Sequence, residues 1–211
     1  MAGGRTIVLT RPAGRNERLA ARLREEGHAV VVCPLVEIEP IETGPLELDG
    51  YDWLLLTSAA GAEELRKRAS GRPGKVAAIG RATAEAWGEV DLVASVSTQE
   101  GLLAELPRPS GRVLFAGAEG ARRLIVDELG ADFVALYRTT PLVPDEAPEG
   151  DLAVVASPSA ACALVAVAPA MPVVSIGPET SAAAKQAGLV VLAEAEEPGL
   201  DGLVRAVSKA G

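Results

Sequence analysis

Two short stretches decide the fold: LLLTSAAGAEEL, which begins at Leu54, and VVASPSAACAL, which begins at Val154. Each is an apolar run that ends at a small hydroxyl residue and then changes to a helical pattern. A second matched pair follows them, AAIGRATAEA from Ala77 and VSIGPETSAA from Val174. Apolar runs that alternate with helical segments are typical of βα units in a parallel sheet.

The offset between the matched stretches is nearly constant along the chain. It is 99 residues from Ser58 to Ser157 and 97 residues from Thr83 to Thr180. The stretch from Gly111 also repeats the N-terminal order of strand, arginine-containing loop, amphipathic helix and strand. A unit of roughly 100 residues therefore occurs twice, which indicates a two-fold duplication and not a solenoid.

Each repeat reads as strands separated by helices. The expected strands are 6–10, 28–33, 53–57, 75–79, 91–94, 112–116, 133–137, 152–156, 172–176 and 189–193. They lack period-2 alternation, which is typical of parallel sheets covered on both faces. We therefore expect an α/β protein with two domains, each a five-stranded parallel sheet flanked by helices. The Pro- and Glu-rich stretches 36–42 and 138–150 break the pattern and are candidate linkers.

The composition argues against several classes of protein. The 211 residues are 48% hydrophobic, which is enough for one large core or two small ones. No run reaches the roughly 18 apolar residues of a membrane span. The N-terminus lacks the apolar segment of a signal peptide, so we expect a cytoplasmic protein with no membrane partner. A net charge of −9 and 3% aromatic residues argue against nucleic-acid binding.

Metal and cofactor motifs are missing from the sequence. Cys33 and Cys162 have no metal or redox spacing, and we expect both to be small buried hydrophobes. The single histidine, His28, excludes a multi-histidine metal site. The chain has no P-loop, no GxGxxG after a strand and no GxSxG. We therefore expect no metal and no cofactor, and a reaction that needs little acid–base help from the protein.

Small hydroxyl residues recur at the ends of the expected strands. They are Thr57, Ser58, Thr83, Ser157, Ser159 and Thr180. Ligands of open parallel sheets bind at the carboxyl ends of the strands, and helix starts there hold carboxylates or phosphates. Arg11 and Arg122 follow two further strands, which favours an anionic ligand. The alternatives are that the hydroxyls only cap their helices and that the arginines are ordinary solvated side chains.

Taken together, the motifs resemble those of the uroporphyrinogen-III synthases, nearly from end to end. The resemblance is carried, in order, by VLTRP from Val8, YDWLLLTSAAG from Tyr51, AAIGRATAEA from Ala77, VLFAGAEGARRL from Val113, ALYRT from Ala135, ASPSA from Ala156, SIGPETSAA from Ser175 and EEPGLDGLVRA from Glu196. Each piece alone is weak, but their order and spacing together are specific.

The resemblance implies a domain division that does not follow the repeats. One domain would combine 1–35 with 143–211, and the other would be 39–137. A two-stranded antiparallel linker, about 36–42 and 138–142, would join them, with the active site in the cleft. The competing interpretation is a non-enzymatic two-domain protein that closes on a small anionic ligand.

The resemblance also implies a reaction, the cyclisation of hydroxymethylbilane to uroporphyrinogen III with ring D inverted. The substrate expels its own hydroxide, and the resulting azafulvene attacks the substituted carbon of ring D to give a spiro intermediate that opens and recloses. No cofactor is implied, because the protein mainly holds the tetrapyrrole in a reactive geometry. We expect a monomeric lyase of haem biosynthesis, and a transient contact with porphobilinogen deaminase is left open.

By the same resemblance, Tyr137 and Thr180 are the candidate catalytic residues. Tyr137 would assist the departure of hydroxide as a hydrogen-bond donor, although it is equally read as a packing residue of the linker. The candidate substrate-binding residues are Arg11, Thr57, Ser58, Thr83, Arg122, Ser157 and Ser159. A substrate with eight carboxylates requires such hydroxyls and arginines at the strand ends.

Overall fold

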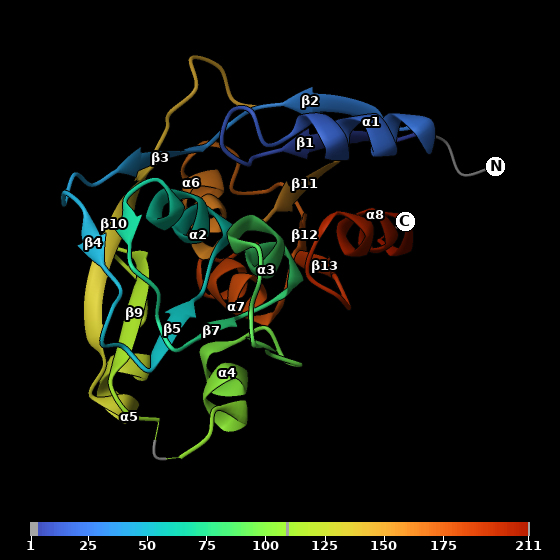
Figure 1. Ribbon diagram of the computed structural model, residues 1–211. Coiled ribbons are helices and arrows are strands. Elements are labelled where there is room, and N and C mark those ends of the chain that lie inside the picture. Colours follow the sequence, from blue (N-terminus) through green and yellow to red (C-terminus); the bar gives the residue numbers. More distant parts are fainter. Residues whose placement is uncertain (1–3, 109, 211) are drawn as a thin grey trace. The chain divides into compact units, whose positions relative to one another are not determined.

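The computed structural model describes residues 4–108 and 110–210, and the chain divides into two compact units. Unit 1 combines an N-terminal segment that ends at Glu37 with a C-terminal segment that begins at Thr140, and unit 2 is Ile38–Thr139. Figure 1 follows the chain through the units by colour. Among the described residues, no helix has both the length and the apolar character needed to cross a membrane.

Unit 1 contains a five-stranded parallel sheet in the order β13-β12-β11-β1-β2. Its strands are β1 (Thr6–Leu9), β2 (Ala29–Val32), β11 (Leu152–Val155), β12 (Val173–Ser175) and β13 (Val191–Glu194). The strands β11 and β12 are buried along their whole length, because helices cover both faces of the sheet. This sheet has the number of strands and the parallel arrangement expected from the sequence.

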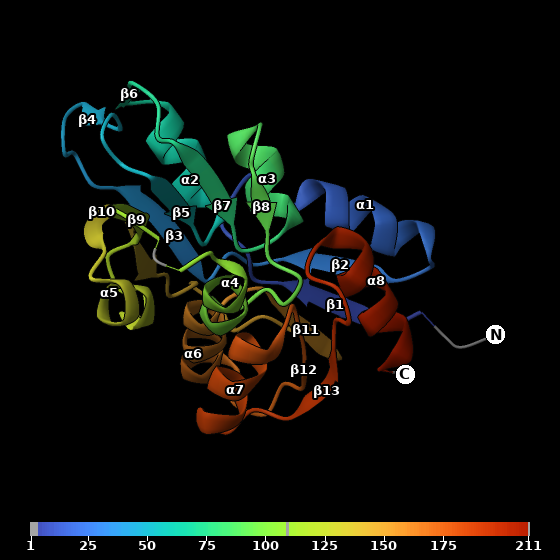
Figure 2. The same ribbon diagram turned by 60° about the horizontal axis from the view of Figure 1, so that its bottom comes forward.

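Two pairs of helices cover this sheet, one pair on each face (Figure 2). They are α1 (Glu17–Glu25) with α8 (Leu200–Lys209), and α6 (Pro158–Val167) with α7 (Pro178–Gln186). In β1, Ile7 packs towards α1 and α8, whereas Val8 packs towards α6 and α7. Cys162 is exposed, so the expectation that it is buried is wrong. On α6, Cys162 lies on a different face from the buried Ala161 and Leu164.

Unit 2 is built on a six-stranded sheet in the order β3-β10-β9-β5-β7-β8. Its strands are β3 (Val36–Pro40), β5 (Trp53–Leu56), β7 (Lys75–Ala78), β8 (Leu92–Val93), β9 (Val113–Ala118) and β10 (Asp132–Pro141). The sixth strand arises because the expected linker strands belong to this sheet. The long strand β10 contains both the expected strand 133–137 and most of the expected linker strand 138–142.

The pairing of β3 with β10 is antiparallel. The N–H of Ile41 donates to the carbonyl of Leu136 (2.9 Å), and the N–H of Leu142 donates to the carbonyl of Leu35 (2.8 Å). The partner residue number falls as the number on the other strand rises, which defines an antiparallel pair. The other neighbours in this sheet are parallel.

Helices also cover both faces of the unit 2 sheet. They are α2 (Ala59–Arg66) with α3 (Arg81–Trp87), and α4 (Gln99–Glu105) with α5 (Leu124–Leu129). A small parallel pair, β4 (Leu46–Glu47) with β6 (Ala69–Ser70), was not expected from the sequence. Two-residue strands are too short to produce a periodic pattern.

The two sheets have the same order when their strands are assigned to the repeats. In unit 1, β2 and β1 come from the first repeat and β11, β12 and β13 from the second. In unit 2, β10 and β9 come from the second repeat and β5, β7 and β8 from the first. Each sheet therefore joins the first two strands of one repeat to three strands of the other, and the unit 2 sheet has β3 as an additional edge strand.

Candidate functional site

The hydroxyl residues singled out in the sequence gather at the carboxyl end of the sheet in each unit. In unit 2, Thr57 and Ser58 follow β5, and Thr83 lies in the first turn of α3, after β7. In unit 1, Ser157 follows β11, and Thr180 lies in the first turn of α7, after β12. Parallel strands end at one edge, so each unit carries its own set. These sets are called the unit 1 edge and the unit 2 edge.

Ser58 and Tyr137 form a hydroxyl pair at the unit 2 edge. The distance between Ser58 Oγ and Tyr137 OH is 2.9 Å, and the N–H of Gly61 donates to Ser58 Oγ (3.0 Å). Tyr137 is 7% exposed, and its ring packs among buried residues such as Leu54. The ring of Tyr137 is therefore packed in unit 2, and its role as a hydrogen-bond donor to the leaving hydroxide stays a prediction.

Ser157 occupies the corresponding place at the unit 1 edge. Its Oγ accepts a hydrogen bond from the N–H of Ala160 (3.2 Å) and lies 3.0 Å from Ser159 Oγ. Ser58 and Ser157 are thus both N-cap residues, of α2 and α6. Both serines therefore cap their helices, and their expected role in substrate binding stays a prediction.

Thr83 and Thr180 differ from the two serines. Their helices begin at the glycine caps Gly80 and Gly177, so both threonines lie three residues inside the cap. They are 4% and 3% exposed, respectively. Neither threonine hydroxyl, nor that of Thr57, forms a hydrogen bond with any residue among 4–108 and 110–210. Capping therefore does not explain Thr83 or Thr180.

Arg11 lies at the unit 1 edge, in the loop after β1, and is half-buried. Its guanidinium forms no hydrogen bond or ion pair with another residue of the described part of the chain. Desolvation lowers the pKa of Arg11, and the positive charge of Arg15 lowers it further, while Glu17 acts in the opposite direction. A half-buried arginine without a partner favours the binding of an anion.

Arg122 lies at the unit 2 edge, where it forms an ion pair with Glu100. It is exposed, and its Nη1 donates to Glu100 Oε2 (3.2 Å) at the start of α4. The hydrogen bond from Arg122 is the main reason that the pKa of Glu100 is lowered. The ion pair with Glu100 would compete with a substrate carboxylate for Arg122. The sequence carried no signal for this partner, because Glu100 belongs to a different element.

The sequence did not indicate a role for two buried amide side chains. Asn16 and Gln99 are 1% and 4% exposed, and the side-chain oxygen of each is buried without a hydrogen-bond partner in the described structure. Their side-chain nitrogens donate to the backbone carbonyls of Arg11 (2.9 Å) and Arg122 (3.0 Å). Neither amide belongs to a motif that marks a site, so only the fold reveals this arrangement.

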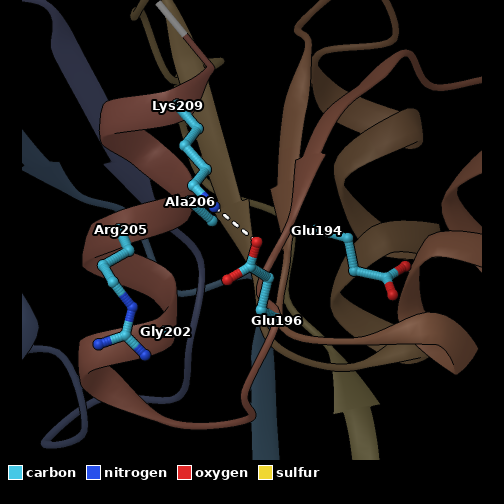
Figure 3. A pocket seen from close by; sticks show the side chains of 6 residues that line it. All are labelled: Glu194, Glu196, Gly202, Arg205, Ala206 and Lys209. Carbon is cyan, nitrogen blue, oxygen red and sulfur yellow. Dashed lines mark hydrogen bonds and ion pairs between the residues drawn. The ribbon is translucent and has the colours of Figure 1, made fainter.

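A second group of charged side chains, near the end of β13, forms surface ion pairs. Figure 3 shows a shallow hollow at the end of β13, where Lys209 donates to Glu196 (2.6 Å). Arg205 is paired with Glu197 (3.2 Å), so these cations form ordinary surface ion pairs. Within the described residues, no group of three or more His, Cys, Asp or Glu side chains could hold a metal ion.

Comparisons with known proteins cover nearly the whole chain. The family model described as uroporphyrinogen-III synthase HemD matches residues 17–205. The chain is 30% identical to the uroporphyrinogen-III synthase of Synechococcus elongatus, over 98% of this chain and 95% of that one. It is 29% identical to the chloroplastic uroporphyrinogen-III synthase of Oryza sativa subsp. japonica, over 97% of this chain and 80% of that one.

A solved structure shares the fold. A mutant uroporphyrinogen III synthase from Thermus thermophilus superposes with a TM-score of 0.63 at 15% identity, covering 97% of this chain and 98% of that chain. The two α/β units and their connection therefore follow an architecture already seen in a crystal structure.

Proposed function

Because this chain belongs to the uroporphyrinogen-III synthase family, we propose that it cyclises hydroxymethylbilane to uroporphyrinogen III with ring D inverted. It is an enzyme, a cyclising lyase of tetrapyrrole biosynthesis. The competing interpretation, a non-enzymatic binding protein, has no support from these two relatives, which are synthases that match 97–98% of this chain.

The observation that carries the assignment of the site is the pair Thr83 and Thr180. They occupy the same position in the two repeats, and neither hydroxyl is used by the described part of the fold. Linear hydroxymethylbilane carries eight carboxylates, which require many separate donors. Two edges with free hydroxyls match that requirement better than a single compact anion site.

We assign Tyr137 to the departure of hydroxide. In the first step the bond between carbon and hydroxyl oxygen breaks, and the electron pair of the pyrrole forms the azafulvene. Negative charge develops on the leaving oxygen, so a hydrogen bond from Tyr137 OH stabilises this transition state. Ser58 lies 2.9 Å from Tyr137 OH and holds it in place. Thr180 supplies a second donor to the reacting tetrapyrrole.

The remaining candidates bind substrate carboxylates. Arg11 offers a guanidinium that has no partner in the described part of the chain, and Arg122 offers one for which Glu100 competes. Thr57, Ser157 and Ser159 add hydroxyls beside the starts of α2 and α6, where backbone N–H groups also favour an anion. In this reaction the protein lowers the barrier mainly by holding a flexible chain in a reactive geometry.

The pyrrole rings of the substrate supply the electrons for every bond change, so the proposed mechanism uses no metal and no cofactor.

We also propose that the enzyme acts as a cytoplasmic monomer. Light scattering after gel filtration measures its mass. A transient contact with porphobilinogen deaminase, which supplies the substrate, is tested by varying the ratio of the two enzymes at constant flux.

A coupled assay tests the function directly. Porphobilinogen and porphobilinogen deaminase generate hydroxymethylbilane, this protein is added, the products are oxidised, and isomers I and III are separated. We expect isomer III, at the same rate after treatment with a chelator. Isomer I alone, as with heat-denatured protein, would favour the binding protein. Activity that is lost on chelation and restored by a metal would contradict the cofactor-free mechanism.

A further inference from the structure

The side chain of Asn16 is committed to the shape of the loop that carries Arg11. Asn16 directly precedes α1, yet its side chain makes no capping hydrogen bond to that helix. Its Nδ2 instead donates to the carbonyls of Arg11 (2.9 Å) and Pro12 (3.2 Å). The two bonds close the loop on itself immediately after β1.

The orientation of this amide follows from its partners. If the amide were flipped, its oxygen would face the two carbonyl oxygens of Arg11 and Pro12, which repel it. In the observed orientation Asn16 Oδ1 is buried and has no hydrogen-bond partner among the described residues. A buried polar atom without a partner costs on the order of 1–3 kcal/mol. One side of the Asn16 amide is thus committed to the loop, while the other side has no partner among the described residues.

The same arrangement occurs in unit 2 with a different residue. Gln99 is the first residue of α4, and its Nε2 donates to the carbonyl of Arg122 (3.0 Å), while its Oε1 is buried without a partner in the described structure. The loops that carry Arg11 and Arg122 follow corresponding strands, β1 and β9. Asn16 and Gln99, however, occupy positions that do not correspond in the repeats. The shared contact is thus not a simple copy made by the duplication.

We propose that Asn16 is a positioning residue for Arg11. By drawing the carbonyls of Arg11 and Pro12 towards itself, it sets the direction in which the Arg11 side chain leaves the loop. The Arg11 guanidinium, which has no partner within the described residues, is then presented to a carboxylate of the substrate. This inference rests on the proposed function, in which Arg11 binds such a carboxylate.

A double-mutant cycle in the full chain tests this role. The variants are Asn16→Ala, Arg11→Ala and the double variant, and the measured quantities are KM and kcat for enzymatically made hydroxymethylbilane. Loss of a charge-assisted hydrogen bond predicts that Arg11→Ala raises KM roughly 10- to 100-fold. Asn16→Ala should raise KM about 10-fold and leave kcat within about threefold. The double variant should have the KM of Arg11→Ala.

A purely structural role predicts a different pattern. Asn16→Ala would then lower stability and active fraction without changing KM, or would add its full effect to Arg11→Ala. Either result overturns the proposal, as does an unchanged KM in Arg11→Ala. Asn16→Ser, which fits the same space, replaces Asn16→Ala if the alanine variant does not fold. Ser208→Ala removes hydrogen bonds elsewhere in unit 1 and should leave KM unchanged.

The result also separates this inference from the proposed function. If the unmodified protein makes only isomer I, the proposed function is wrong. If it makes isomer III and Asn16→Ala has a normal KM, only the positioning role is wrong.

Discussion

At the scale of single residues, the hydroxyl side chains divide into two groups. Ser58 and Ser157 accept backbone hydrogen bonds as helix caps, whereas Thr83 and Thr180 do not. The sequence suggested one shared role for all of them, because all follow a strand. The serines are the N-cap residues of their helices, whereas the threonines lie three residues after the N-cap. Only the structure shows where each helix begins.

Replacing either threonine by valine should affect catalysis without affecting folding. The two side chains have nearly the same shape, and the lost hydroxyl has no described partner, so we expect a change in unfolding free energy below about 1 kcal/mol. If the hydroxyls bind the substrate, Thr180→Val should slow the reaction roughly 10- to 1000-fold. Thr83→Val should act in the same direction.

The matched controls are Thr83→Ser and Thr180→Ser, which keep the hydroxyl and should retain most of the rate. Steady-state rates and isomer ratios, together with urea unfolding curves, measure both effects. Full rate and a normal isomer ratio in both valine variants would show that these hydroxyls do not contact the substrate.

The hydroxyl of Tyr137 should matter more than that of the other tyrosine in the chain. Tyr137→Phe keeps the buried ring and removes only the donor next to Ser58, so we expect a rate reduction of roughly 10- to 1000-fold. Tyr51→Phe is the control. It breaks a hydrogen bond with Asp132 at the opposite end of the sheet and should leave the rate unchanged. Equal rates for the two variants would assign Tyr137 to packing alone.

At the scale of elements, the site is built from strand ends that lead directly into helix starts. The helices α2 and α6 each begin with a capping serine, and α6 has a proline in its first turn. Their local signals, a hydroxyl residue before an apolar helix, are readable in the sequence. The pairing partners of these serines, Tyr137 and Ser159, are not equally readable, because Tyr137 arrives from a strand far along the chain.

Ser157 separates the cost of a lost cap from the loss of substrate binding. Ser157→Ala should destabilise the protein by about 1 kcal/mol, since the N–H of Ala160 loses its acceptor. Its rate should fall only slightly, because backbone N–H groups remain at the same helix start. Ser157→Asp keeps the cap and the stability but places a negative charge beside substrate carboxylates, so its KM should rise. A normal KM in the aspartate variant would remove Ser157 from the binding set.

At the scale of the whole molecule, each unit combines strands from both sequence repeats. Apart from the edge strand β3 of unit 2, each sheet takes two strands from one repeat and three from the other, and each has hydrophobic clusters on both faces. Unit 2 is continuous in the sequence, from Ile38 to Thr139, whereas unit 1 is formed by both ends of the chain.

This organisation predicts that residues 38–139 form an independent domain. The segment contains both hydrophobic clusters of unit 2 and all of the strands that pair around β9 and β5, so we expect it to unfold cooperatively when expressed alone. It lacks Arg11, Ser157 and Thr180, so it should not form isomer III. Circular dichroism during thermal unfolding is the measurement. A fragment cut at the repeat boundary, 1–105, divides both sheets and should not fold.

The sequence by itself determined the class of fold, the duplication and the positions of most helices and strands. These features depend on local periodicity, short apolar runs and residues such as Ser157 that begin a helix. Only the tertiary structure decided which strands share a sheet and which side chains meet there. The two repeats have similar apolar strands, so strands from either repeat could form the backbone hydrogen bonds along the edges of β1. Likewise, the contacts of Asn16 with Arg11 and of Arg122 with Glu100 depend on how a loop closes and how two elements pack. Which of these contacts form is decided by the free energy of the whole fold, so a local sequence pattern cannot predict them.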